Sequence, residues 1–217
     1  WNCSQAFITE LNNLTGLNFR LPSEAEWEFA ARGGNKSKGY TYSGSDNPDD
    51  VAWYNIEGII GKAIREVKTK MPNELGLYDM HGNVWEWTAS ANGSCRFYRG
   101  GSFYLNASCC LSGIRLWDDP DSRDDNLGFR LVAVKATKGF SAEQKDVKFI
   151  QEKSKNEEIT VAGIEMVRIP DSVEHKGLYF GKYEVTQKQW QEIMRNNQSR
   201  FKGDLSCPVE KVSWYDC

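Results

Sequence analysis

Apolar residues near the start of the chain recur every three or four positions. Phe7, Leu11 and Leu14 share this spacing, with polar residues between them. The pattern predicts an amphipathic helix over residues 4–15, because side chains three or four apart lie on one helical face. Gly16 follows, and glycine is a residue type that commonly ends helices.

A second helix is predicted in the stretch LPSEAEWEFAARGG, which begins at Leu21. Ser23 and Glu26 stand three residues apart, as in a capping box that opens a helix. Gly33 is expected to close it. Residues 34–72 are rich in Gly, Asp, Asn and Ser with scattered aromatics, so we expect long loops and short strands there.

The remaining chain mixes short apolar runs with turn residues. Val84, Trp85 and Trp87 predict an aromatic strand that follows the turn at Gly82 and Asn83. Further strands are predicted at GFRLVAV (128–134), in a hairpin or strand pair at ITVAGIEMVRIP (159–170) and at YFGKYEVT (179–186), and a third helix at KQWQEIMRN (188–196). The charged stretch between residues 135 and 158 is compatible with a helix or a linker.

One segment, from Arg99 to Val132, follows no helical or strand period. Its apolar side chains stand among polar, turn-forming residues, and they are Phe103, Tyr104, Leu105, Cys109, Cys110, Leu111, Ile114, Leu116 and Trp117. A soluble protein does not need such a mixture for its core alone. The segment is therefore the first candidate for a functional surface.

Composition excludes several classes of function. The 217 residues are 40% hydrophobic and carry a net charge of −3, so they support a folded core but give no electrostatic basis for binding nucleic acid. No apolar run approaches the roughly 20 residues of a membrane span, and we expect no transmembrane segment. The six cysteines form no CxxC pair and the two histidines have no zinc-like spacing, so free thiols are expected.

Several long motifs together resemble one family. RLPSEAEWEFAARGG, GLYDMHGNVWEW, RGGSF and NLGFRL are similar to the formylglycine-generating-enzyme (sulfatase-modifying factor) domain, and GKYEVTQKQWQEIM and PVEKVSWYDC resemble the N-terminal part of that domain. The resemblance implies an α+β protein with a C-type lectin fold, containing short strands, two or more helices and long loops. It covers most of the chain apart from roughly residues 133–160.

The order of these motifs is rotated relative to the family. Residues 159–217 resemble the family's N-terminal part and residues 1–132 its C-terminal part, with a linker or an extra helix at 133–158. A circular permutation, a window across two tandem copies and a rotated numbering all explain this order. We expect one C-type lectin-type domain over residues 1–217, because joining neighbouring termini costs mainly loop closure.

The family's founding activity is an oxidation that uses two copper-binding cysteines. A copper site of this type needs two soft thiolate ligands. When this chain is aligned with the family at the RGGS motif, the family's second cysteine corresponds to Cys110. The first cysteine corresponds to Leu105, which cannot bind copper. Cys109 is adjacent to Cys110 and points away from it in an extended chain. An oxidase is therefore the disfavoured alternative, and we expect no catalytic residue.

The irregular segment also resembles the variable region of diversity-generating retroelement proteins, which use the same fold. In that family a constant frame alternates with positions whose codons are randomised through a template, and residues 97–132 would form this region. The positions that the resemblance assigns to ligand binding are Phe103, Tyr104, Leu105, Asn106, Cys109, Leu111, Gly113, Ile114, Leu116, Trp117, Asp118, Asp119 and Ser122. Asn-type template codons do not give Trp117, which needs another codon.

The resemblance implies a non-catalytic receptor or adhesin that displays a hypervariable surface. Its ligand would be a protein or a cell-surface molecule. Relatives include a surface lipoprotein of a spirochaete, which implies bacterial surface display or export, with a lipid anchor outside this chain. A third hypothesis is a scaffold or sensor domain of the same fold without a variable site. It needs only the shared core motifs.

A structural calcium ion is also implied by the resemblance, although no cofactor is required for binding. The positions that match the family's calcium site are Asp79, Gly82, Val84 and Glu86. Two carboxylates and two backbone carbonyls are the hard oxygen ligands that calcium prefers. The alternative is that Glu86 satisfies backbone amides in a buried turn.

Overall fold

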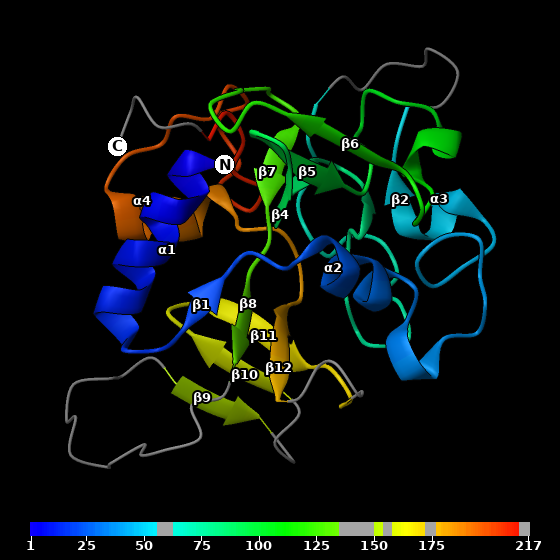
Figure 1. The fold of residues 1–217 in the computed structure, drawn as a ribbon, viewed down its shortest axis with the longest axis horizontal. Coiled ribbons are helices and arrows are strands. Elements are labelled where there is room, and N and C mark those ends of the chain that lie inside the picture. The colour runs from blue at the N-terminus through cyan, green and yellow to red at the C-terminus, as the bar shows by residue number, and fades with distance from the viewer. Residues whose placement is uncertain (56–62, 135–149, 154–157, 172–176, 213–217) are drawn as a thin grey trace.

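The computed structural model describes residues 1–55, 63–134, 158–171 and 177–212, together with the backbone of residues 150–153. Helices and short strands mix as in the predicted α+β, C-type lectin-like fold (Figure 1). The helices are α1 (Asn2–Thr15), α2 (Glu24–Ala31), α3 (Pro48–Val51) and α4 (Gln187–Met194), with short 3-10 turns η1 (Gly34–Lys36) and η2 (Ala107–Cys110). No helix among the described residues is long and apolar enough to span a bilayer.

The strands form three sheets. The largest has the order β1 (Phe19–Arg20), β8 (Val132–Val134), β12 (Leu178–Gly181), β11 (Ile164–Arg168), β10 (Glu158–Val161) and β9 (Ile150–Lys153), with every pairing antiparallel. The second has the order β6 (Arg115–Asp118), β5 (Cys95–Arg99), β4 (Trp85–Asn92) and β7 (Leu127–Phe129). Strands β2 (Ala52–Trp53) and β3 (His81–Gly82) make a short parallel pair.

Helix α1 ends where the sequence predicts, but its buried face differs from the predicted one. Gly16 takes the left-handed conformation, with φ of 68°, and its N–H donates to the carbonyl of Asn12. Phe7 and Leu11 are fully buried, whereas Leu14 is 63% exposed. In the last turn Thr15 faces inward instead, and its hydroxyl donates to a backbone carbonyl. Leu14 is therefore not part of the core stripe.

The helix starts agree closely with the sequence. The hydroxyl of Ser23 accepts from the N–H of Glu26, and the Glu26 carboxylate accepts from the N–H of Ser23. Helix α4 begins with the same reciprocal pair between Thr186 and Gln189. Each capping box satisfies backbone donors that a helix start leaves without an intrahelical partner.

The predicted strand at 128–134 is in fact two strands in two different sheets. Strand β7 ends at Phe129 and pairs with β4, whereas β8 begins at Val132 and lies between β1 and β12. Between them, the fully buried guanidinium of Arg130 reaches the carboxylate of Glu86 and the carbonyls of Gly181 and Tyr78. The chain changes sheets at this residue because that bonding turns Arg130 into the interior.

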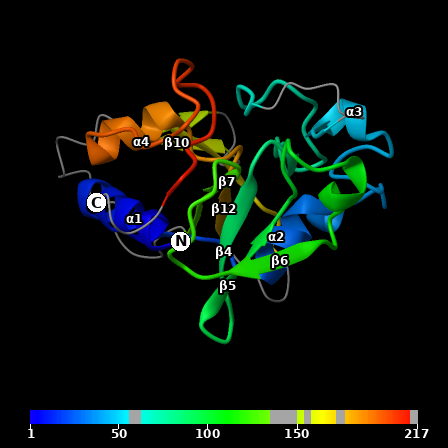
Figure 2. The same ribbon diagram turned by 90° about the horizontal axis from the view of Figure 1, so that it is seen from above.

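The two parts of the rotated chain share one core. Strand β8 from the first part pairs with β12 from the second, and α1 lies beside α4 (Figures 1 and 2). The main hydrophobic cluster joins Phe7 and Phe129 of the first part to Met166 and Trp190 of the second. Burial of these side chains is the main stabilising contribution to the association of the two parts.

The linker region also departs from expectation where the structure describes it. Residues 133–134 belong to β8, Ile150–Lys153 form β9, and β9 pairs antiparallel with β10. A helix over Ile150–Lys153 is therefore wrong, whereas residues 133–134 fall within the strand predicted at 128–134. The hairpin predicted at 159–170 is confirmed, with its turn at Ala162 and Gly163 in positive-φ conformations. Residues 135–149 and 154–157 lie outside the described residues.

Candidate ligand-binding face

Two glycines permit close packing at and near the irregular segment, one against the 3-10 turn η2 and one against strand β2. At Gly101, where φ is +78°, a Cβ atom would lie 2.6 Å from the thiol sulfur of Cys110. At Gly82, a Cβ would lie 2.1 Å from the carbonyl oxygen of Trp53. Both approaches exclude any side chain. The RGGS and HGN motifs are therefore required for packing, whatever the segment between β5 and β6 does.

A buried arginine ties the segment to α2. The guanidinium of Arg99 is fully buried, forms an ion pair with Glu28, and donates to the carbonyl of Ile114 at 2.9 Å. It also lies over the ring of Trp27, with 5.4 Å from the guanidinium carbon to the ring centroid. Because charge-assisted hydrogen bonds fix geometry strongly, Arg99 holds the start of β6 in place.

A buried histidine that sequence reasoning missed anchors the middle of the segment. His81 has no exposed surface, and its Nδ1 accepts from the N–H of Ser43 at 3.0 Å. A neutral ring then carries its proton on Nε2, which donates to the Ser112 hydroxyl 3.1 Å away. Burial, followed by the charges of Arg32 and Arg99, lowers the pKa of His81 to about 3. Spacing along the chain gives no signal for this contact.

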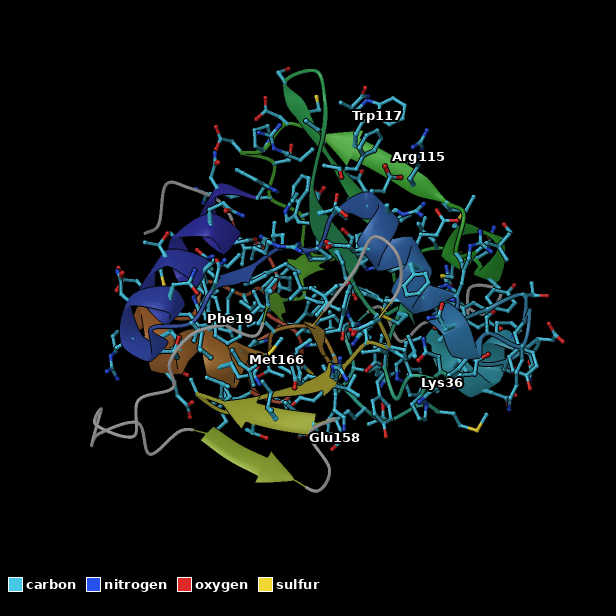
Figure 3. The ribbon with its side chains drawn as sticks, turned by 60° about the horizontal axis from the view of Figure 1, so that its bottom comes forward. Phe19, Lys36, Arg115, Trp117, Glu158 and Met166 are labelled. Carbon is cyan, nitrogen blue, oxygen red and sulfur yellow. The ribbon has the colours of Figure 1, made fainter. Side chains whose placement is uncertain are left out.

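Strand β6 carries the most exposed apolar side chains of the segment. Leu116 is 43% and Trp117 52% exposed, and they point to opposite faces of the strand. Trp117 stands opposite Phe97 of β5 and meets its ring edge to face at 5.9 Å. The guanidinium of Arg115 lies 5.0 Å from the same ring of Phe97. Figure 3 shows Arg115 and Trp117 at the outer side of the molecule.

The structure separates the predicted ligand-binding residues by exposure. Exposed are Asn106, Gly113, Leu116, Trp117 and Asp119, and half-buried are Tyr104, Leu105, Cys109, Leu111, Ile114, Asp118 and Ser122. Within the half-buried group, Leu105 and Ile114 pack against the main core. Phe97 and Arg115 are additional residues of this face that the predicted set lacks.

Phe103 requires a correction. It is only 5% exposed and packs with Ile64, Val84 and Cys207 in a small hydrophobic cluster. The prediction that Phe103 contacts a ligand is wrong for this arrangement, because its ring has almost no surface to offer. Its neighbour Tyr104 lies at the border of the candidate face. The ring centroids of Phe103 and Tyr104 are 4.2 Å apart.

Contacts around Tyr104, at the border of the candidate face, join the two parts of the chain. The hydroxyl of Tyr104 donates to the carboxylate of Asp125 at 3.3 Å, and Asp125 also forms an ion pair with Arg200. The ring of Phe201 meets Phe103 edge to face. Arg200 and Phe201 therefore border the candidate face, which the sequence order alone does not indicate.

Cys110 does not have the surroundings of a copper ligand. Its thiol is fully buried, and burial, followed by the proximity of Cys109, raises its pKa to about 12. A metal ligand must be the thiolate, which this environment disfavours. Leu105 offers no ligand atom at the other position, so the residues present do not fit a two-cysteine copper site.

The carboxylates of the expected calcium site are partly engaged by other groups of the protein. Both carboxylate oxygens of Glu86 accept from Arg130, at 2.7 to 3.1 Å, and one also accepts from the indole N–H of Trp27 at 2.6 Å. Oδ2 of Asp79 accepts from the N–H of Lys68 at 2.7 Å. Among the described residues no group of three or more metal-ligating side chains is present.

Arg130 thus supplies the positive charge that balances Glu86, whereas Oδ1 of Asp79 is buried without a hydrogen-bond partner among the described residues. Burial first of all raises the pKa of Asp79 to about 6. Burial, and then the negative charges of Asp79 and Glu86, raise the pKa of Glu184 well above its ordinary value. Burial therefore shifts both acids toward their protonated forms relative to exposed carboxyl groups.

Comparison with known proteins places this geometry in a family. The model of the sulfatase-modifying factor enzyme 1-like domain matches residues 1–135. The chain is 39% identical over 152 residues to the inactive C-alpha-formylglycine-generating enzyme 2 of Bos taurus, covering 61% of this chain and 48% of that protein. It is 31% identical over 165 residues to the formylglycine-generating enzyme of Mus musculus, covering 61% and 42%.

A bacterial relative, chaperone protein LppX of Paenibacillus barcinonensis, is 40% identical over 139 residues, covering 54% of this chain and 50% of that protein. The chain spans about half the length of the curated relatives it matches. Among solved structures, Treponema denticola variable protein 1 is 39% identical with a TM-score of 0.48, covering 53% of this chain and 47% of that one. Since the family model matches more than half of its residues, the chain belongs to the sulfatase-modifying factor enzyme 1-like, or formylglycine-generating-enzyme, family.

Proposed function

We propose that this chain is a non-catalytic ligand-binding receptor or adhesin whose binding face is built from the non-frame residues between Tyr104 and Ser122. The observation that carries the proposal is a division within one segment. The frame residues Arg99, Ser102, Cys110 and Ser112 are buried. Five of the predicted variable positions are exposed, Trp117 and Leu116 above all, and seven more are half-buried.

This division is what a diversified surface requires. Exposed side chains change with little effect on stability, whereas buried frame residues do not. A site is also more selective when rigid elements hold it, as Arg99 and His81 hold this segment. The exposed ring of Trp117, with Phe97 behind it, is the kind of aromatic anchor that dominates protein-binding faces.

The family's oxidase activity is less well supported by the same residues. That activity would need thiolates at positions 105 and 110, and the chain has Leu105 and a buried Cys110. The two relatives named as inactive, from Bos taurus and Mus musculus, are 39% and 38% identical to this chain. They are compatible with a family member that binds without catalysing.

The setting that we propose is display at a bacterial surface or in an exported protein, with a protein or a cell-surface molecule as ligand. A lipid anchor would lie outside this chain. The resemblance of the irregular segment to variable regions of surface proteins supports this setting. The exposed aromatic ring of Trp117 suits a protein ligand, since aromatic anchors dominate protein-binding faces.

Deep sequencing of the codons for residues 97–132, with the neighbouring DNA, tests the proposal across a population of the source cells. Targeted diversification predicts substitutions confined to positions that are adenine in a nearby near-copy of the segment. A uniform sequence without such a copy would overturn diversified display. It would favour a scaffold of the same fold, and copper uptake with thiol oxidation would then be measured on the purified chain.

A further inference from the structure

Strand β6 is the last strand of its sheet. The order β6-β5-β4-β7 gives it a neighbour on one side, and no strand pairs with its other edge in the part of the chain that the structure describes. Figures 2 and 3 show the strand at the outside of the molecule. An unpaired edge presents backbone N–H and C=O groups at every second residue, and these are ready to pair with another extended chain.

We propose that the ligand of the candidate face is an extended peptide segment of a protein, which adds to β6 as an antiparallel fifth strand. This inference rests on the proposed function and names the way in which the face makes contact. Antiparallel pairing is favoured because it is the more stable arrangement and places residues directly opposite each other. β-strand addition of this kind is a common way for a sheet edge to bind peptide.

A diversified strand is well suited to this mode. Backbone hydrogen bonds do not depend on side-chain identity, so β6 keeps a constant source of affinity whatever stands at Leu116, Trp117 and Asp118. The side chains then select the ligand, since alternate residues face opposite sides of the sheet. Binding through the edge therefore combines a constant backbone contact with a variable side-chain contact.

The charges along β6 define the chemistry of the added strand. Each cross-strand row would be extended by one peptide residue, because Trp117 already stands opposite Phe97 and Leu116 opposite Tyr98. The row that ends at Asp118 favours a basic residue, and the row that ends at Arg115 favours an acidic one.

Read in the peptide's own direction, the favoured order is a basic residue, an aromatic, an aliphatic and an acidic residue. Asp119 and Asp121 follow Asp118 and strengthen the preference for a basic residue at the start. Arg115 already lies 3.3 Å from the carboxylate of Glu24, so an acidic peptide residue would join an existing ion pair. The peptide that matches β6 therefore has a basic residue at one end and an acidic residue at the other, and not charges of a single sign.

A library of random ten-residue peptides, displayed on yeast and selected against the whole purified chain, tests the inference. Peptides enriched by the selection are synthesised. Their affinity is then measured for the unchanged chain and for the variants Trp117→Ala and Leu14→Ala. Leu14 is an exposed apolar residue in the last turn of α1 and serves as the control. Each peptide is also made with single N-methylated amides along its length, and the amide exchange of residues 115–118 is followed with and without peptide.

The inference predicts that N-methylation weakens peptide binding at every second position along the peptide. Methylation of every second amide should weaken binding about tenfold, because it removes a hydrogen-bond donor, and methylation of the amides between should have little effect. Exchange of the β6 amides should slow on binding, Trp117→Ala should weaken binding, and Leu14→Ala should not. Selected peptides should carry the basic residue before the acidic one.

Two results would overturn the inference and separate it from the proposed function. Peptides that need Trp117 but show no alternating N-methyl effect and no slowed exchange would leave a side-chain binding face without strand addition. Peptides that bind equally to Trp117→Ala, or no enrichment at all, would remove β6 as a docking strand. The codon sequencing would still decide whether the segment is diversified.

Discussion

The ring of Phe7 stacks on the indole of Trp190, with centroids 5.4 Å apart and planes 9° apart. Both rings also meet Phe129 edge to face, at 5.6 and 6.2 Å. Phe7 lies in the part of the chain that resembles the family's C-terminal portion, and Trp190 in the part that resembles its N-terminal portion. The three rings therefore join the two parts, which in the rotated order are linked only through residues 135–157 along the chain.

Replacing Phe7 with alanine should destabilise the whole domain. Loss of a buried phenylalanine ring costs about 3–5 kcal/mol through lost burial and the cavity that remains. Urea unfolding should show one transition at a lower midpoint, since both parts share the core. Leu14→Ala, on the exposed side of the same helix, should change stability by less than about 0.5 kcal/mol. Two separate transitions in Phe7→Ala would mean that the parts fold independently.

Removing Arg130 should be more harmful than removing it together with the charge it balances. Arg130→Met leaves the carboxylate of Glu86 buried without its ion-pair partner, and such a change costs about 3–5 kcal/mol. The double variant Arg130→Met, Glu86→Gln should recover part of this loss. Urea unfolding of both variants and of Glu86→Gln completes a double-mutant cycle. Additive effects would show that the two side chains do not act as a pair.

Phe103 and Trp117 should respond to alanine in opposite ways. Phe103→Ala opens a cavity in the cluster with Ile64 and Val84, and should lower stability by about 3–5 kcal/mol. Trp117→Ala removes a half-exposed ring, should cost much less stability, and should weaken binding of any ligand selected on this face. Thermal melting and a binding titration on the same samples check both. Equal melting temperatures for the two variants would contradict the assignment of Phe103 to the core.

His81 should make the protein less stable as pH falls below about 6.5. Its folded pKa of about 3 lies below the unfolded value, so the unfolded chain takes up a proton that the folded chain refuses. Stability should therefore rise with pH between about 3 and 6.5, by up to about 1.4 kcal/mol per pH unit for one group. Above this window the contribution is fully present.

The variant His81→Gln isolates this effect, since glutamine keeps hydrogen-bonding capacity without titrating in this range. Asp79, with its pKa raised to about 6, has the opposite sign, because its stabilising contribution is lost as pH rises through that value. Asp79 is present in both the unchanged protein and His81→Gln, so its contribution cancels when the unfolding free energies of the two are subtracted. Urea unfolding at several pH values from 4 to 7.5 gives the two curves. Parallel curves would contradict a neutral buried His81.

Calcium should leave the melting temperature unchanged. Arg130 already engages both oxygens of Glu86, so an added ion would have to displace a buried guanidinium. Thermal melts in millimolar calcium and in chelator provide the measurement, with Asp79→Asn as the matched variant. A rise of several degrees in calcium that Asp79→Asn abolishes would restore the calcium site implied by the family resemblance.

The elements with local signals were predicted well. The predicted capping box at Ser23 lies within four residues of sequence, and Gly16 ends α1 by its own left-handed conformation. The hairpin turn at Ala162 and Gly163 is equally local. Each of these depends on hydrogen bonds or backbone preferences of neighbouring residues, so a short window of sequence contains the needed information.

Elements that depend on distant partners were predicted less well. The strand at 128–134 divides because Arg130 bonds to Glu86 and to carbonyls far away in the chain. Phe103 is buried because Ile64 and Cys207 reach it from distant segments. In the apolar pattern alone Phe103 and Trp117 are equivalent, since both are aromatic residues in an irregular stretch.

By itself, the sequence determined the family frame, the starts and ends of α1 and α2 to within about two residues, and the irregular segment that we propose as the binding face. Only the tertiary structure decided which side chains of that segment reach solvent, that Arg130 balances Glu86, and that β6 lies at the edge of its sheet among the described strands. The physical reason is the range of the interactions. Capping and turn formation involve residues a few positions apart, whereas burial, charge pairing and strand order depend on segments that meet only in the folded chain.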